Sequence, residues 1–284
     1  MNASMISLRV STRIMAFTVA SWMGGVAVGQ EIDAAAETLT RRVPGTAVEF
    51  ELVRCPGGEV RSAEGALVEV GSLWVLRTEV AWDLYDVFVF GLDEAEGEGL
   101  DGVSRPSKPY VPPDRGYGHA GYPAIGMTRA GAEAFCAWLE ARTGLAARLP
   151  TREEWTYLAR GGTGETDGLP DDAELGDFAW FEGNTDNSTE AVGQKRPNSF
   201  GLHDMLGNVA EWVVTDTRRP VAMGGSFREE AGACTPVSSQ MQASSWNTSD
   251  PQIPKSAWWL ADCGWVGFRF VVDSIENEGV GDDE

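Results

Sequence analysis

Residues 201–212 read Gly-Leu-His-Asp-Met-Leu-Gly-Asn-Val-Ala-Glu-Trp, and no other stretch of the chain constrains the fold as strongly. Its glycines and asparagine permit a tight turn that exposes backbone carbonyl oxygens. Asp204 and Glu211 place carboxylates on either side of that turn. Calcium binds mixtures of carboxylate and carbonyl oxygens, so a calcium site is one interpretation. The residues alone favour the simpler alternative, in which Asp204 caps the turn and Glu211 forms a salt bridge.

Helix signals precede this stretch. Thr128 can cap a helix that ends at Gly144, because the apolar residues between them recur at helical spacing. Thr151 and Glu154 form a capping-box pattern at the start of a second helix. A shorter helix is expected within 78–88, where the aromatic residues also follow a helical spacing.

Strand signals lie nearer the N-terminus. Apolar residues roughly alternate in 48–53 and 67–75, with Pro-Gly-Gly at 56–58 between them, which predicts two strands joined by a turn-bearing loop. Residues 91–126 are predicted to form a long surface loop with several tyrosines. We find no internal repeat and no domain boundary, so one domain is expected over 47–273.

The composition narrows the class of protein. The 284 residues include 22 Lys and Arg against 43 Asp and Glu, giving a net charge of −21. So acidic a chain lacks the basic surface that binds nucleic acid or anionic membranes. A hydrophobic content of 43% is sufficient for a core, while 34 glycines and 11 tryptophans predict a loop-rich α+β domain rather than a helical bundle.

The N-terminal segment is typical of a targeting signal. Residues 1–30 contain arginines at the start, then an apolar run, then small residues, and they lack acidic side chains. This pattern predicts a secretory signal peptide and an exported, periplasmic or extracellular protein, with no membrane span in the mature chain. Residues 31–46 are expected to be a polar leader, and the acidic residues of 274–284 a disordered tail.

The cysteines do not resemble a zinc site. Cys55, Cys136, Cys234 and Cys263 lack C-x-x-C spacing, and the chain has two histidines. In an exported protein these four residues are disulfide candidates with three possible full pairings. We find no nucleophile elbow, P-loop, zinc-protease or dinucleotide-binding pattern.

Several motifs, in order, resemble the formylglycine-generating enzyme, or sulfatase-modifying factor, family. They are Arg-Leu-Pro-Thr at 148–151, Glu-Glu-Trp at 153–155, Gly-Asn-Val at 207–209, Glu-Trp at 211–212, Gly-Gly-Ser-Phe at 224–227 and Gly-Phe-Arg at 267–269. The resemblance implies a single α+β domain of the variant C-type-lectin-like fold, rich in loops. We interpret Arg148, Glu154 and Arg269 as structural residues that act through capping and ion pairing.

The resemblance also implies structural calcium. In the family, positions matching Asp204, Gly207, Val209 and Glu211 supply its ligands, through side chains at the carboxylates and backbone carbonyls at the other two. A second family calcium site begins near Asn184, where this chain is shorter. That site is therefore the weaker expectation.

The copper site of the family is incomplete in this chain. Family oxidases convert a sulfatase cysteine to formylglycine with copper held by two cysteines, and paired thiolates suit Cu(I). The matching positions here are Glu229 and Cys234. A carboxylate and one thiolate make a poor Cu(I) site, so an active oxidase is not expected.

The remaining expectations follow from the same resemblance. Family packing brings Cys263 near the Gly-Gly-Ser strand, which favours a Cys234–Cys263 disulfide over a lone metal thiolate. The leading hypothesis is a secreted, calcium-stabilised, non-catalytic module that binds a protein or glycan, with aromatic side chains in 105–122 and 246–259 as candidate contacts. The alternatives are an oxidase that uses Cys234 and Glu229 with copper, or an unrelated enzyme in the same cleft.

Overall fold

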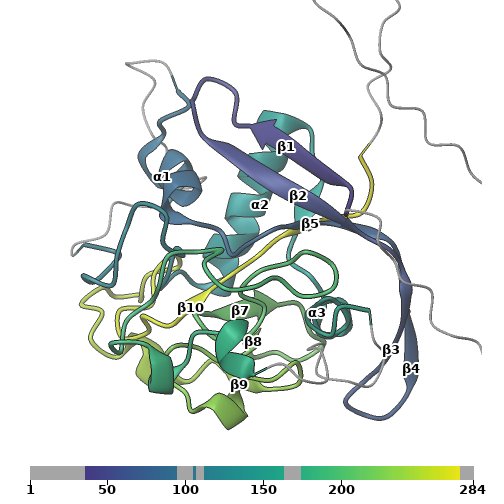
Figure 1. Cartoon of the computed structure of the whole chain (residues 1–284). Helices are drawn as coiled ribbons and strands as arrows, with labels where there is room; N and C mark the ends of the chain where they lie inside the picture. The colour runs from purple at the N-terminus through teal and green to yellow at the C-terminus, as the bar shows by residue number, and fades with distance from the viewer. Residues whose placement is uncertain (1–35, 95–104, 107–111, 163–173, 276–284) are drawn as a thin grey trace, which may run out of the picture. The chain divides into compact units, whose positions relative to one another are not determined.

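A five-stranded antiparallel sheet joins the beginning and the end of the domain (Figure 1). The computed structural model describes residues 36–94, 105–106, 112–162 and 174–275. The strand order is β1-β2-β5-β11-β6, so β11 lies between strands from much earlier in the chain. The bounds are Thr38–Arg42 (β1), Glu49–Cys55 (β2), Leu73–Leu76 (β5), Ala147–Arg148 (β6) and Val271–Val272 (β11).

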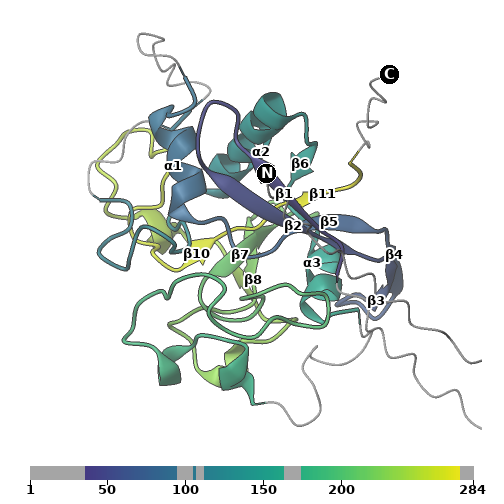
Figure 2. The same ribbon diagram turned by 45° about the horizontal axis from the view of Figure 1, so that its top comes forward.

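Two smaller sheets complete the β structure. A four-stranded sheet has the order β10-β7-β8-β9, and β3 pairs with β4 in a separate hairpin. Figure 2 shows this hairpin lying beside α3, away from α1. The bounds are Gly58–Arg61 (β3), Leu67–Val70 (β4), Ala210–Val213 (β7), Val221–Met223 (β8), Ser239–Met241 (β9) and Val266–Gly267 (β10).

The α-helices begin where the capping signals predict. The Thr128 side chain accepts a hydrogen bond from the N–H of Gly131 at the start of α2, and Gly144 ends that helix in the left-handed conformation. Thr151 and Glu154 form the capping box of α3. The α-helices are Trp82–Phe90 (α1), Arg129–Thr143 (α2) and Arg152–Ala159 (α3), and the short 3-10 helices are Leu175–Asp177, Glu182–Asn184, Ala231–Ala233 and Ser244–Asn247.

Two hydrophobic clusters fill the interior. The larger one packs aromatic rings of α1 and α2 against the C-terminal segment, with Tyr85, Phe135 and Phe268 in mutual contact. The smaller one surrounds the buried Trp155 of α3 and includes Cys234. The predicted α+β class with little regular structure is confirmed.

Two boundaries differ from the expectations. Strand β1 lies inside 31–46, which the sequence predicted to be a leader, because its backbone pairs with β2 from Thr38 to Arg42. The predicted strand at 67–75 is two strands, β4 and β5, which belong to different sheets. The predicted signal peptide at 1–30 and nearly all of the tail lie outside the described residues. Among the described residues, no helix is long and apolar enough to cross a membrane.

Candidate functional site

The Gly-Gly-Ser-Phe turn follows β8 and lies directly against Cys234. Gly224 and Gly225 have φ values of +95° and +75°, which favour glycine. A Cβ atom on Gly225 would lie 2.9 Å from the Cys234 Sγ atom. The turn therefore packs against this thiol with no space for a side chain.

Glu229 occupies the position of the first family copper ligand, and both of its carboxylate oxygens already accept hydrogen bonds. The Ser226 hydroxyl donates to Oε2, and the Gln240 side-chain amide donates to Oε1 over 2.8 Å. The indole N–H of Trp265 in turn donates to Gln240 over 3.0 Å. The Glu229 carboxylate is thus fixed in position by hydrogen bonds from Ser226 and Gln240.

Cys234 occupies the second position and is protonated. Its side chain is buried, and its Sγ atom contacts the Ser226 carbonyl oxygen at 3.7 Å. Burial, and then the charge of Glu229, raise the pKa of the thiol to about 12. Cu(I) prefers a pair of soft thiolate ligands, and one of the two positions here carries a hard carboxylate, so these residues do not fit the copper centre that the family resemblance implies.

The expected Cys234–Cys263 disulfide is absent from the structure. All four cysteines are buried free thiols. Cys234 belongs to the smaller hydrophobic cluster and Cys263 to the larger one. The prediction placed Cys234 and Cys263 near each other, whereas the fold places them in different hydrophobic clusters.

A buried ion pair lies behind the turn at 201–212. The Arg269 Nη2 atom donates to Glu211 Oε1 over 2.8 Å, and its Nε atom lies 3.1 Å from each carboxylate oxygen. The Trp155 indole N–H donates to Glu211 Oε2 over 2.7 Å. The same guanidinium donates to the carbonyl oxygens of Leu76, Arg77 and His203. The structural roles predicted for Arg269 and for the Arg148–Glu154 pair are confirmed.

Two more buried carboxyl groups surround this ion pair. Neither oxygen of Glu79 has a hydrogen-bond partner among the described residues, and the same holds for Oδ1 of Asp204. Burial, then the charges of Asp204 and Glu211, raise the pKa of Glu79 well above its usual range. Burial also raises the pKa of Asp204 to about 6, against the opposing effects of the Gly193 N–H group and Arg269. Burial and the neighbouring negative charges therefore favour the protonated form of Glu79.

The predicted calcium ligands lie in one turn, but they do not fit a calcium site as arranged. Glu211 has both carboxylate oxygens occupied by Arg269 and Trp155, and a guanidinium among the ligands would repel the ion. The Asn184 side chain forms local hydrogen bonds with Phe181 and Ala179, so it is also engaged. Glu211 forms the salt bridge of the simpler alternative, whereas Asp204 accepts a hydrogen bond from the Gly193 N–H group instead of capping its own turn.

Sequence reasoning missed two polar features. Glu79 is buried between strand β5 and helix α1, and its only signal was a carboxylate between Thr78 and Val80 in an apolar segment. His119 bridges Asp114 and Asp86, with nitrogen–oxygen distances of 3.0 and 2.7 Å. No local pattern could predict that bridge, because Asp86 is on α1, 33 residues away.

Most of the aromatic side chains proposed as contacts belong to the interior. Trp246 is buried, while Trp258, Trp259, Tyr117 and Tyr122 are half-buried and pack against the larger cluster. Tyr110 lies outside the described residues. The main contacts of these side chains are therefore with the hydrophobic core and not with solvent.

Solved structures share this fold. The Treponema denticola variable protein 1 superposes with a TM-score of 0.61 at 20% identity, covering 84% of this chain and 99% of that one. PvdO from Pseudomonas aeruginosa gives a TM-score of 0.55 at 20% identity, covering 82% and 100%. At this identity the likeness concerns the fold alone.

Sequence comparison finds curated relatives over shorter regions. A formylglycine-generating enzyme of Mycobacterium tuberculosis is 36% identical over 109 residues, which cover 34% of this chain and 34% of that protein. A chaperone protein LppX of Paenibacillus barcinonensis is 38% identical over 84 residues, which cover 23% of this chain and 30% of that protein. Each match thus spans about a third of this chain or less, whereas the model of the sulfatase-modifying factor enzyme 1-like domain matches residues 40–274. The chain belongs to the sulfatase-modifying factor enzyme 1-like domain family.

Proposed function

We propose that this protein is a non-catalytic member of the family, which uses the domain to bind a protein or glycan partner. The observation that carries the proposal is the state of Glu229 and Cys234. The carboxylate is held by Ser226 and Gln240, and the thiol is buried and protonated. One of the two positions carries no sulfur, so the pair of thiolates that the oxidases use is incomplete.

Two further observations support a binding role. The chaperone relative is named for an effect on other proteins, although the match covers 30% of its length. In this chain, apolar side chains are exposed on and beside β9: Val237 is 61% exposed and Met241 is 57% exposed. Large apolar side chains left exposed are available for contact with a partner. We also propose that the protein acts after export, on the signal-like pattern of residues 1–30.

The proposal is tested by incubating the full chain with a cysteine-containing sulfatase peptide, Cu(I) and oxygen. We expect neither aldehyde formation, detected by hydrazide labelling, nor oxygen consumption above that of a Cys234→Ser variant. Aldehyde formation by the wild type that Cys234→Ser abolishes would overturn the proposal. The variant Glu229→Cys is the matched control, because it restores the second sulfur at the family position.

A further inference from the structure

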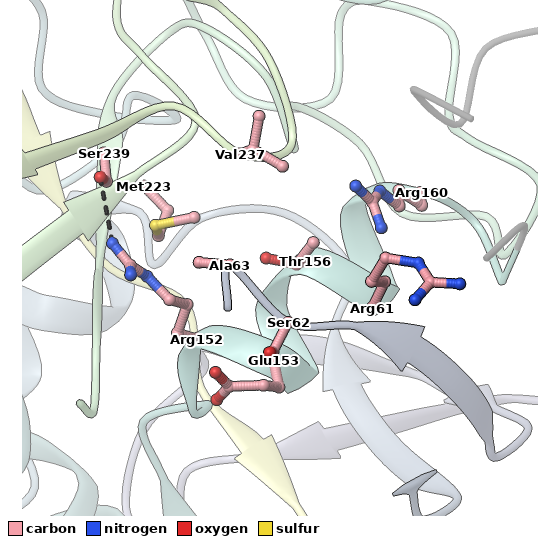
Figure 3. A pocket seen from close by; sticks show the side chains of 10 residues that line it. All are labelled: Arg61, Ser62, Ala63, Arg152, Glu153, Thr156, Arg160, Met223, Val237 and Ser239. Carbon is pink, nitrogen blue, oxygen red and sulfur yellow. Dashed lines mark hydrogen bonds between the residues drawn. The ribbon is translucent and has the colours of Figure 1, made fainter. Parts of the chain in front are cut away.

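A pocket of about 450 Å³ lies on the opposite face of the β7-β8-β9 strands from Glu229 (Figure 3). Successive side chains of a strand point to opposite faces. On β9, Gln240 reaches Glu229, whereas the neighbouring Ser239 lines the pocket. Ser239 pairs across the strands with Met223, which also lines it. The pocket and Glu229 therefore lie on opposite faces of β9.

Three arginines line this pocket in a strongly acidic chain. Arg152 and Arg160 belong to α3 and its C-cap, and Arg61 ends strand β3. Figure 3 shows Arg61 and Arg160 toward one end and Arg152 at the other, with Thr156 between them. Among the described residues that line the pocket, Glu153 is the one carboxylate. The lining therefore has a net positive charge, although the whole chain has a net charge of −21.

The positions of these side chains follow from helical spacing. Arg152, Thr156 and Arg160 are each four residues apart, so they lie along one face of α3. The helix itself is fixed at its start by the Thr151–Glu154 capping box. The Tyr157 hydroxyl also donates to the Pro56 carbonyl oxygen over 3.1 Å, which holds α3 against the segment before β3. The fold therefore sets the positions of Arg152 and Arg160 before any ligand binds.

Arg152 has an unused donor at this site. Its Nη2 atom donates to the Ser239 hydroxyl over 3.1 Å. Its Nε–H group is buried and has no hydrogen-bond partner among the described residues. A buried donor without a partner is costly, and turning the Arg152 side chain toward an anionic acceptor in the pocket would remove that cost.

We propose that this pocket binds a small molecule carrying more than one negative charge, through its carboxylate or phosphate oxygens. Guanidinium groups bind both kinds of oxyanion with directed, charge-assisted hydrogen bonds. Val237 and Met223 provide an apolar wall for the carbon skeleton of such a ligand. The proposal does not depend on whether Glu229 and Cys234 are catalytic.

The probes are citrate and inorganic phosphate, measured by calorimetric titration of the full chain at constant ionic strength. We expect saturable binding of at least one probe, and the tighter of the two identifies the preferred oxyanion. Arg152→Gln and Arg61→Gln should each weaken it about tenfold, or about 1.4 kcal/mol. Arg218→Gln removes the same charge from an exposed position outside the pocket, and should leave the affinity unchanged.

Two results would overturn the proposal. One is that the wild type binds neither probe saturably. The other is that Arg218→Gln weakens binding as much as the pocket variants do, which would show a general charge effect. Circular dichroism and thermal unfolding establish that each variant is folded, and Arg160→Gln replaces any variant that is not.

Discussion

Arg269 and Glu211 form an ion pair in which both side chains are almost fully buried, at 0% and 1% exposure. Glu211 lies in β7, and Arg269 lies between β10 and β11. Every carboxylate oxygen of Glu211 accepts a hydrogen bond from Arg269 or Trp155. This pair connects the turn at 201–212 to the C-terminal part of the domain.

Removing one partner of this pair should strongly destabilise the protein. Arg269→Gln leaves a buried carboxylate without its counter-charge, and we expect the free energy of unfolding to fall by about 3–5 kcal/mol in urea titrations. The control is Arg42→Gln, because Arg42 pairs with Glu49 at the exposed surface. That variant should change stability by less than about 1 kcal/mol. Similar losses in the two variants would contradict the assignment of a buried pair.

Asp204 should make stability depend on pH in the acidic range. Burial raises its pKa from 3.8 to about 6, so the folded protein binds this proton more tightly than the unfolded chain does. The stability that it contributes is full below pH 3.8 and is lost as the pH rises through about 6. Asp204→Asn should flatten this part of the stability curve, measured by urea unfolding at a series of pH values. A curve with unchanged slope would show that another group is responsible.

The stability that His119 contributes should be lost at a higher pH than the stability that Asp204 contributes. Burial alone would lower its pKa, but hydrogen bonds and charges from Asp86 and then Asp114 outweigh burial and raise it. Its contribution to stability is therefore full below pH 6.5 and lost as the pH rises beyond its folded-state pKa. Proton NMR should find the His119 ring titrating above the His203 ring, whose pKa is lowered chiefly by burial. The reverse order would refute the bridge between the two carboxylates.

The four cysteines should resist alkylation in the folded protein. Burial raises the pKa of Cys55, Cys234 and Cys263 to about 12, and that of Cys136 further, and the thiolate is the reactive form. Iodoacetamide at pH 8 should therefore label few thiols until the chain is unfolded, when all four react. Non-reducing peptide mapping should find no bridged peptides. A Cys234–Cys263 peptide would restore the disulfide expectation.

Calcium should leave the thermal stability of the protein unchanged. Glu211 is already neutralised by Arg269, so a calcium ion would need to displace the guanidinium. Equal melting temperatures with calcium and with chelator are expected for the wild type and for Asp204→Ala alike. A calcium-dependent rise that Asp204→Ala removes would instead establish the family metal site.

Local sequence signals were sufficient for the helices. Thr128 and Thr151 satisfy backbone N–H groups within their own first turns, so their roles are visible in a few residues. The break at Gly71 and Ser72 was not read correctly, because apolar residues continue on both sides while the strands change sheets. Sheet membership depends on partners that a local pattern does not contain.

The candidate site likewise has features that the local sequence predicts and features that depend on distant residues. The replacement of a family cysteine by Glu229 is visible in the sequence. Its hydrogen bond with Gln240 is less visible, because Gln240 lies on β9, 11 residues further along the chain. The choice between calcium and a salt bridge at Glu211 depended on Arg269, which is 58 residues away. Glu79 was missed because burial of a carboxylate is decided by packing around it.

The position of β11 between β5 and β6 has a consequence for synthesis of the protein. Strands β1, β2, β5 and β6 leave the ribosome before residues 271–272, which must then enter between β5 and β6. Until they do, two inner strand edges stay unpaired, and Arg269 cannot reach the carbonyl oxygens of Leu76 and Arg77. The nascent chain therefore completes its sheet only after nearly all of the domain has been translated, and it is most exposed to aggregation just before that step.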